Sequence, residues 1–238
     1  AIAEIHYHPA DPTDSELAVD PSLTSNAFEF LELANISDAP INLAGMQFTV
    51  GVDFRFQPDA TSILAAGERL LIVNDRDAFE MRYGTGLPIA GEFAAGNLGN
   101  SGDQLRLRDH RGEIVFDFTY LDTGQWPELA DGLGASLELV DPLGSYSNGE
   151  NWRHSSEYGG SPAVAGNGPA FDVIINEVLS HSEGENPDLF ELFNLSSETV
   201  DVGGWYISDQ RGNLFRSTLP LGSTIAPGGY VVFDQNEI

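Results

Sequence analysis

The chain has 238 residues, and its 37 acidic side chains against 10 arginines and no lysine give a formal net charge of −27. This excess of negative charge argues against binding to nucleic acids, whose phosphates need cationic partners, and against anionic lipid surfaces. No cysteine is present, which excludes a disulfide framework, a thiolate zinc site and a cysteine nucleophile. The 41% of apolar residues suffice for a core, and no apolar run approaches the ~18 residues of a membrane-spanning helix.

Strand and helix signals in the first half of the chain are local and short. The continuous apolar run over 70–73 is typical of a strand that is buried on both faces. A helix is predicted over 76–83, because Asn74 or Asp75 can cap its start and Gly84 can end it.

Further along the chain, apolar residues alternate with polar ones. Two such runs, over 105–108 and 114–120, flank a glycine-containing turn and predict a β-hairpin. Residues 136–140 alternate again, which predicts another strand. Many short strands separated by turns favour a sandwich or a barrel.

An uncharged segment rich in glycine and proline, residues 159–169, divides the chain unequally. Such a composition is typical of a linker. We therefore predict a first domain over 1–160, a linker over 161–170 and a second domain over 171–238.

Sequence blocks repeat on the two sides of this segment. The matched pairs of blocks are 2–5 with 175–178, 30–37 with 189–196, 41–46 with 200–205, and 66–72 with 227–233. Glu32 and Glu191 differ by 159 positions, whereas Glu4 and Glu177 differ by 173, so the first copy has 14 additional residues between its first two strands. The repeat predicts that Glu4 and Glu32 occupy the same strand positions as Glu177 and Glu191.

These repeated blocks resemble the lamin tail domain. The resemblance rests on Ile-x-Glu-Val at 175–178, Glu-Leu-x-Asn at 191–194 and Val-Asp-Val-Gly-Gly-Trp-Tyr-Ile-Ser-Asp at 200–209. The first copy resembles the form found in large secreted bacterial proteins, through motifs at 67–73, 78–84, 126–137, 151–153 and 159–162. The resemblance implies two tandem immunoglobulin-like β-sandwiches, with the second copy incomplete.

The second copy has no counterpart of the hairpin near 104–120 or of the strand near 137. We therefore expect the chain to be a fragment of a longer protein, or its second domain to be completed by strands of a neighbouring chain, because open sheet edges are rarely left exposed. Apolar side chains are expected to be left bare at Leu189, Phe193, Trp205, Val231 and Phe233.

Two groups of residues could hold a metal ion. Glu4 and His6 share one face of the first strand, and Glu32 lies on a strand that the resemblance places beside it; imidazole and carboxylate ligands suit zinc and similar metals. The acidic insert containing Asp11 and Asp14 could bind Ca²⁺ through oxygen ligands. The alternative is that the glutamates are bonded to arginines and backbone groups and that the insert is a solvated loop.

Other chemical interpretations have weaker support. Paired glutamates can hydrolyse glycosides, but a strand pair that recurs in both copies suggests architecture. The sequons at Asn35 and Asn194 lie just after equivalent strands, which favours a role in turns. Trp126, Trp152 and Trp205 could stack on sugars, although buried tryptophan is common in such sandwiches.

The resemblance implies a protein that is not an enzyme. We expect a structural, adhesive or tethering module of a larger secreted or surface protein of a bacterium, located outside the cell and binding protein or glycan partners or a second copy. The alternative is an accessory module, carbohydrate-binding in one version, of a secreted hydrolase. Neither nucleic acid binding nor membrane insertion is expected.

Overall fold

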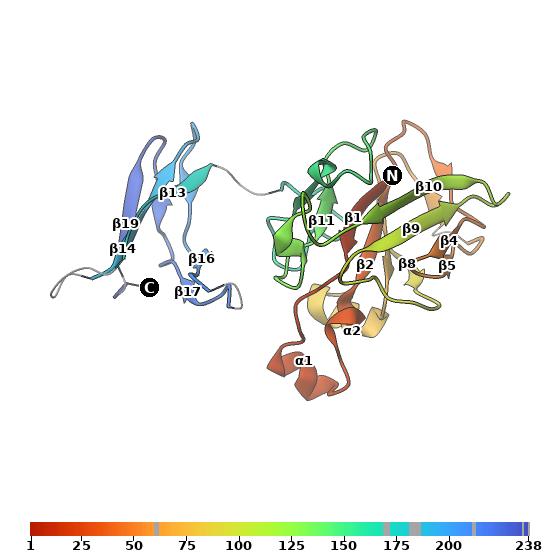
Figure 1. Ribbon diagram of the computed structural model, residues 1–238, viewed down its shortest axis with the longest axis horizontal. Helices are drawn as coiled ribbons and strands as arrows, with labels where there is room; N and C mark the ends of the chain where they lie inside the picture. Colours follow the sequence, from red (N-terminus) through yellow and green to blue (C-terminus); the bar gives the residue numbers. More distant parts are fainter. Residues whose placement is uncertain (60–61, 169–171, 181–186, 211–212, 235, 238) are drawn as a thin grey trace. The chain divides into compact units, whose positions relative to one another are not determined.

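A computed structural model describes residues 1–59, 62–168, 172–180, 187–210, 213–234 and 236–237. The chain forms two compact units, Ala1–Pro169 and Ala170–Ile238, which are called unit 1 and unit 2 below (Figure 1). The all-β prediction is confirmed, since the described elements are mostly short strands. Neither helix in the described residues is long and apolar enough to cross a membrane.

Unit 1 contains twelve strands and two α-helices among its described residues. In chain order they are β1 (Ile2–His6), α1 (Asp14–Val19), β2 (Phe30–Ala34), β3 (Ile41–Asn42), β4 (Gln47–Val50), β5 (Phe54–Arg55), β6 (Ile63–Leu64), β7 (Arg69–Val73), α2 (Arg76–Tyr83), β8 (Ile89–Glu92), β9 (Asp103–Arg108), β10 (Ile114–Tyr120), β11 (Leu137–Leu139) and β12 (Trp152–His154).

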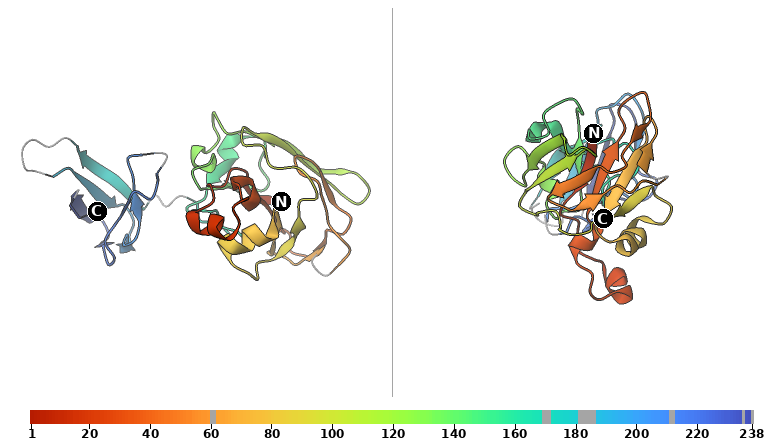
Figure 2. Two further views of the ribbon diagram at one scale, coloured as in Figure 1. Left: turned by 90° about the horizontal axis from the view of Figure 1, so that it is seen from below. Right: turned by 90° about the vertical axis from the view of Figure 1, so that its right-hand side faces the viewer.

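Two sheets of unit 1 pack face to face. One has the strand order β12-β11-β1-β2-β7-β8 and the other β10-β9-β4-β5. The largest hydrophobic cluster joins them, because it combines Ile5 and Ile72 of the first sheet with Phe48, Leu105 and Phe118 of the second. This arrangement is the predicted β-sandwich, and Figure 2 shows the sheets curving around a common interior.

The helix α2 occupies the predicted residues and covers the outer face of the six-stranded sheet. Asp75 accepts a hydrogen bond from the backbone N–H of Ala78, and Gly84 ends the helix with a positive φ of 84°. The ring of Phe79 packs with Phe30 and Leu71 in a second cluster. The strand β7 is therefore buried on both faces, as its continuous apolar run predicts.

The acidic insert forms a capped helix, which corrects the interpretation as a loop. Thr13 and Glu16 form a capping box at the start of α1. Glu16 also forms an ion pair with Arg82 of α2 at 2.9 Å, and the Arg82 guanidinium lies 3.2 Å from the centre of the Phe28 ring. Figure 1 shows α1 projecting away from the two sheets.

Unit 2 repeats the centre of unit 1 with fewer strands. Its described strands are β13 (Val173–Leu179), β14 (Leu189–Asn194), β15 (Val200–Asp201), β16 (Tyr206–Ile207), β17 (Ser217–Thr218), β18 (Thr224–Ile225) and β19 (Tyr230–Asp234). The sheet β13-β14-β19 corresponds to β1-β2-β7, and two-stranded pairs join β15 to β18 and β16 to β17.

The predicted equivalence of the glutamates is confirmed by strand register. Glu4 pairs with Glu32, and Glu177 pairs with Glu191. A register shift precedes each pair at the same place, between Ile2 and Glu4 and between Ile175 and Glu177. Because a slip of one residue would reverse every side chain, the shared irregularity shows that the two copies fold alike here.

Candidate functional site

Three glutamates lie side by side on one face of the six-stranded sheet. Glu4 of β1 pairs with Glu138 of β11 on one side and with Glu32 of β2 on the other. All three side chains are buried, with exposed fractions of 1%, 4% and 0% for Glu4, Glu138 and Glu32. Burial of three adjacent carboxyl groups is costly unless each one has hydrogen-bond or charged partners. These three side chains are called the glutamate ladder below.

A segment that returns from the end of unit 1 crosses the ladder and supplies these partners. Residues 159–166 are called the strap. Ser161 donates from its backbone N–H to Glu4 Oε1 at 2.8 Å, and its hydroxyl lies 3.0 Å from both Glu4 Oε2 and Glu138 Oε1. Ala163 donates its N–H to Glu32 at 2.5 Å. The ladder is thus bonded to the chain's own backbone and hydroxyl groups.

Two arginines and one serine complete the set of partners. Arg69 forms an ion pair with Glu32, and Arg153 forms one with Glu138 at 3.0 Å. Arg153 also donates to the carbonyl oxygen of Gly166 at 2.6 Å, which ties the strap to β12. The hydroxyl of Ser136 donates to Glu4 Oε1 at 2.5 Å. Within the described residues, Glu4 alone of the three forms no ion pair with an arginine.

The charge on Glu4 is consequently the least stabilised of the ladder. Burial, followed by the neighbouring charge of Glu32, raises the pKa of Glu4 to about 8. A protonated Glu4 fits the geometry, because it can donate to the Ser161 hydroxyl while that hydroxyl donates to Glu138. One proton on Glu4 therefore satisfies both contacts of Ser161.

The strap corrects the predicted domain boundary. Residues 161–166 were expected to belong to a free linker, yet Ser161 is buried and bonded to β1 and β11. The absence of charge and the small side chains of this segment reflect close packing on the ladder. Gly160 shows this, because a Cβ added there would lie 2.4 Å from Glu4 Oε1 and 3.1 Å from the Phe30 ring.

The residues predicted to bind a metal are only partly brought together. Glu4 and Glu32 are neighbours, but both are bonded to the strap, and His6 lies beyond them beside Tyr83, whose hydroxyl is 3.4 Å from His6 Nδ1. Asp11 and Asp14 are exposed, and Asp14 opens helix α1. Within the described residues no three His, Asp or Glu side chains are placed to hold a metal ion. Calcium binding stays a prediction without an assigned set of ligands.

Sequence reasoning missed Glu138, Ser136 and Ser161. The alternation over 136–140 was available and puts Glu138 on one face of a strand. No local pattern, however, shows that this strand lies beside Glu4.

The tryptophans divide between the core and the surface. Trp126 and Trp152 are buried, and their rings stack 6.0 Å apart. Trp205 is 38% exposed, and its neighbour Tyr206 contacts the Phe215 ring edge to face. The core role that the sequence favours for these tryptophans therefore holds for Trp126 and Trp152.

The two sequon asparagines brace equivalent turns. The amide of Asn35 donates to the carbonyls of Ala39 and Leu64, and its oxygen accepts from the backbone and hydroxyl of Ser37. Asn194 makes the same four bonds to Glu198, Ile225 and Ser196. Both asparagines are buried, which supports the predicted turn role.

Replacing Asn35 with alanine should destabilise unit 1 by about 2–4 kcal/mol, because the carbonyls of Ala39 and Leu64 and both donors of Ser37 each lose a hydrogen bond. Ser37→Ala, which removes one hydroxyl, should cost about 1 kcal/mol. Urea unfolding monitored by tryptophan fluorescence measures both. Equal effects of the two substitutions would show that the Asn35 side chain does not hold this turn.

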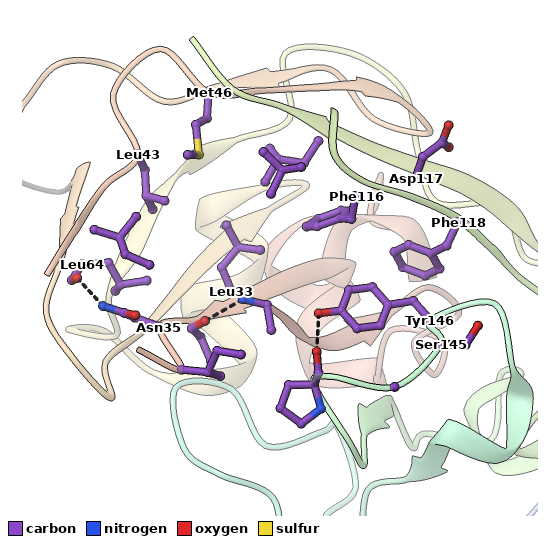
Figure 3. A pocket seen from close by; sticks show the side chains of 18 of the residues that line it. Leu33, Asn35, Leu43, Met46, Leu64, Phe116, Asp117, Phe118, Ser145 and Tyr146 are labelled. Atoms are coloured by element: carbon purple, nitrogen blue, oxygen red, sulfur yellow. Dashed lines mark hydrogen bonds between the residues drawn. The ribbon is translucent and has the colours of Figure 1, made fainter. Parts of the chain in front are cut away.

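A pocket of about 480 Å³ opens at one end of the sandwich of unit 1. Figure 3 shows Phe116, Phe118 and Tyr146 on one side of it and aliphatic side chains on the other. The one charged side chain in its lining, Asp117, forms an ion pair with Arg106 at 2.7 Å. The pocket is mostly lined by apolar side chains, which suits binding of a small hydrophobic group.

Unit 2 exposes apolar positions that unit 1 buries. Ile2, Ile5 and Leu71 are 0% exposed, whereas their counterparts Ile175, Val178 and Val232 are 55%, 62% and 47% exposed. The five side chains expected to be bare are not the ones most exposed. Phe233 is buried against Phe190, and Leu189, Phe193 and Val231 are half-buried, while Trp205 is exposed.

Ile175 and Val178 lie on the face of the sheet that carries Phe190, whereas Val232 lies on the other face, opposite Glu191. Within the described residues β13 pairs only with β14. A groove of about 360 Å³ runs beside this strand. Its lining consists of Ile175, Val178, Phe190, Ile207, Ser208, Asp209, Arg216 and Ser217.

A family model described as the Lamin Tail Domain matches residues 1–122 and 168–237 of the chain. The matched segments correspond to the two copies recognised from the repeated blocks. No curated protein and no solved structure matches the chain.

Proposed function

The chain belongs to the lamin tail domain family, a family of non-enzymatic immunoglobulin-like domains, and we propose that it is a tethering module of a larger secreted or surface protein of a bacterium. In this proposal unit 1 is a closed scaffold and unit 2 makes the contact. The observation that carries it is the exposure of Ile175 and Val178, which line one groove beside β13 at positions where unit 1 has a buried core. Contiguous exposed apolar surface is typical of an interaction site.

The carboxyl groups of unit 1 support a non-catalytic role. Each member of the glutamate ladder is buried beneath the strap and bonded to it. A glycosidase needs two carboxyl groups that face a cleft open to the substrate. The excess of negative charge suits a location outside the cell, where it favours solubility.

The tethering role predicts that a fluorescent passenger fused to the chain is retained on cells of the bacterium that carries the gene. The double substitution Ile175→Asp and Val178→Asp should reduce retention at least tenfold, because it places charge on the exposed apolar face that lines the groove beside β13. Val19→Asp, at an exposed valine of α1, is the matched control and should retain the passenger fully. Retention that is absent with the unmodified chain would contradict tethering.

A carbohydrate-binding module of a secreted hydrolase is the second candidate. The exposed aromatic side chains of Trp205, Tyr206 and Phe215 favour it, because sugars stack on such rings. A glycan array probed with the chain and with Trp205→Ala separates the two candidates. Binding to a defined glycan that Trp205→Ala abolishes would favour this second function.

A further inference from the structure

The arginines without a carboxylate partner gather on one sheet of unit 1. Within the described residues, six arginines form ion pairs with carboxylates, whereas Arg55, Arg108 and Arg111 form none. These three belong to the sheet β10-β9-β4-β5, whose strands Figure 1 shows side by side, or to the turn between β9 and β10. In a chain with 37 acidic side chains and 10 arginines, three neighbouring unpaired arginines point to an anionic partner from outside the chain.

Two of these arginines flank a glutamine in a row across three strands. Gln47 of β4 pairs with Arg108 of β9 on one side and with Arg55 of β5 on the other. Their chain neighbours in the core between the sheets are Phe48, Phe54 and Leu107. Because successive residues of a strand point to opposite faces, the three polar side chains lie on the outer face of the sheet and are called the arginine row below. Two strand spacings separate Arg55 from Arg108, which is roughly 10 Å.

The carboxylates near the arginine row have other partners. Asp117 forms an ion pair with Arg106 at 2.7 Å, and the amide of Gln47 donates to Asp53 at 2.9 Å. Asp109 accepts two backbone N–H groups of the hairpin turn. These contacts hold the three carboxylates in place without pairing them to the arginines of the row.

Both guanidinium groups of the row keep free donors. Arg55 is exposed and its side chain has no hydrogen bond to the described residues. Arg108 donates one bond, to the carbonyl oxygen of Gly112 at 2.7 Å. Because a guanidinium has five N–H donors, each arginine can still form two parallel bonds to one carboxylate of a ligand.

We propose that the arginine row binds an acidic polysaccharide through the carboxylates of its sugar units. An extended chain with a carboxylate on each sugar can reach Arg55 and Arg108 at once, and the amide of Gln47 between them can bond to a sugar hydroxyl. The site lies on unit 1 and goes beyond the tethering proposal, which rests on unit 2.

The character of this face favours a glycan over an acidic polypeptide. The strands β9 and β4 lie inside their sheet, so their backbone groups are already paired and cannot receive an added strand. The arginine row consists of charged and amide side chains, whereas protein partners are anchored mainly by buried aromatic residues and arginines in pockets.

The net charge of the chain favours a sparsely charged polyanion over nucleic acid. Duplex DNA carries one negative charge per about 1.7 Å, far denser than the spacing of roughly 10 Å in the row, so the formal net charge of −27 repels it strongly. At about 0.15 M salt the Debye length is about 8 Å, so carboxylates far from the row are screened while direct contacts to its arginines persist.

A labelled alginate oligosaccharide tests this inference on the full 238-residue chain. Alginate carries a carboxylate on every sugar, and a dextran oligosaccharide of the same length is the neutral control. An oligoglutamate peptide and a DNA oligonucleotide, each with the same number of charges, represent the other polyanions. Fluorescence anisotropy at about 0.15 M NaCl gives the affinities. EDTA in the buffer prevents divalent cations from bridging the probe to the acidic chain.

Arg55→Gln should weaken binding of the alginate probe at least tenfold, because bonds between charged groups are lost. Arg76→Gln in α2 makes the same change of charge away from the row and should change the affinity less than twofold. Arg108→Lys keeps the charge but loses the planar fork, and should weaken binding about fivefold. Circular dichroism verifies that each variant folds.

Three results would overturn a site in the arginine row: no saturable binding of alginate, equal losses for Arg55→Gln and Arg76→Gln, and dextran binding as tightly as alginate. Oligoglutamate or DNA that binds as tightly as alginate would overturn the choice of a glycan and assign the row to that polyanion. The retention assay varies residues of unit 2 only, so failure of this inference leaves the test of tethering independent.

Discussion

Replacing Gly160 with alanine should destabilise unit 1 by about 2–5 kcal/mol. Gly160 has a φ of +87°, where an L-residue costs about 1–2 kcal/mol. Its added Cβ would lie 2.4 Å from Glu4 Oε1 and 3.0 Å from the Ser136 hydroxyl oxygen, and overpacking of this kind costs about 1–3 kcal/mol more. The Glu4 carboxylate cannot move aside easily, because both of its oxygens are bonded to Ser161.

Gly67→Ala is the matched control for this experiment. Gly67 has a similar φ of +78°, but an added Cβ there meets nothing within 4 Å. The control should cost only the backbone strain of about 1–2 kcal/mol. Thermal and urea unfolding of the full chain measure both variants. Equal losses of stability for Gly160→Ala and Gly67→Ala would show that the strap is not packed tightly on the ladder.

The stability of unit 1 should be greatest at about pH 4.5 and should fall on both sides. Burial raises the pKa of Glu4 and of Glu29 to about 8, from an ordinary value of 4.5. As the pH rises from about 5 to about 8, the unfolded chain releases these two protons before the folded chain does, so the free energy of unfolding declines. The decline should be about 2–3 kcal/mol for each glutamate between pH 5.5 and pH 8.

His6 sets the acidic limit of this optimum. Burial, followed by the charge of Arg82, lowers the pKa of His6 from 6.5 to about 3. As the pH falls below about 6.5, the unfolded chain takes up a proton on His6 before the folded chain does, which offsets about half of the gain from the two glutamates. Below about pH 4.5 the unfolded glutamates are protonated as well, so the contribution of His6 prevails and stability falls.

Urea unfolding at pH 5.5 and at pH 8 tests the contribution of Glu4. Glu4→Gln should reduce the loss of stability over this interval by about 2–3 kcal/mol, because glutamine cannot ionise but can still donate to Ser161. Glu113→Gln, at an exposed turn, should leave the loss unchanged. A loss of stability that is the same for Glu4→Gln and for the unmodified chain would show that Glu4 does not titrate in this range.

Features that depend on residues near each other in the chain were predictable. The helix over 76–83 follows from a capping side chain at one end and a glycine at the other. The hairpin over 105–120 follows from alternation on both sides of a turn. The equivalence of Glu4 and Glu32 with Glu177 and Glu191 follows from the internal repeat, since two copies of one pattern fold with one register.

The role of the strap and the fate of the candidate metal ligands were not predictable in this way. Glycine, proline and small residues are typical of linkers and also of segments that pack closely on buried side chains, so composition cannot separate the two. What distinguishes the strap from a linker is its contacts with residues far away in the chain, such as that of Ser161 with Glu4, 157 positions apart.

The sequence by itself determined the fold class, the tandem repeat and the local elements, because their signals are periodic and short in range. Tertiary structure alone decided that Glu138 and Ser161 meet Glu4, that His6 is buried, and that Val178 is exposed where Ile5 is covered. The physical reason is that a side chain's partners depend on which strands become neighbours. The period of a strand specifies which face a residue is on, but not what covers that face.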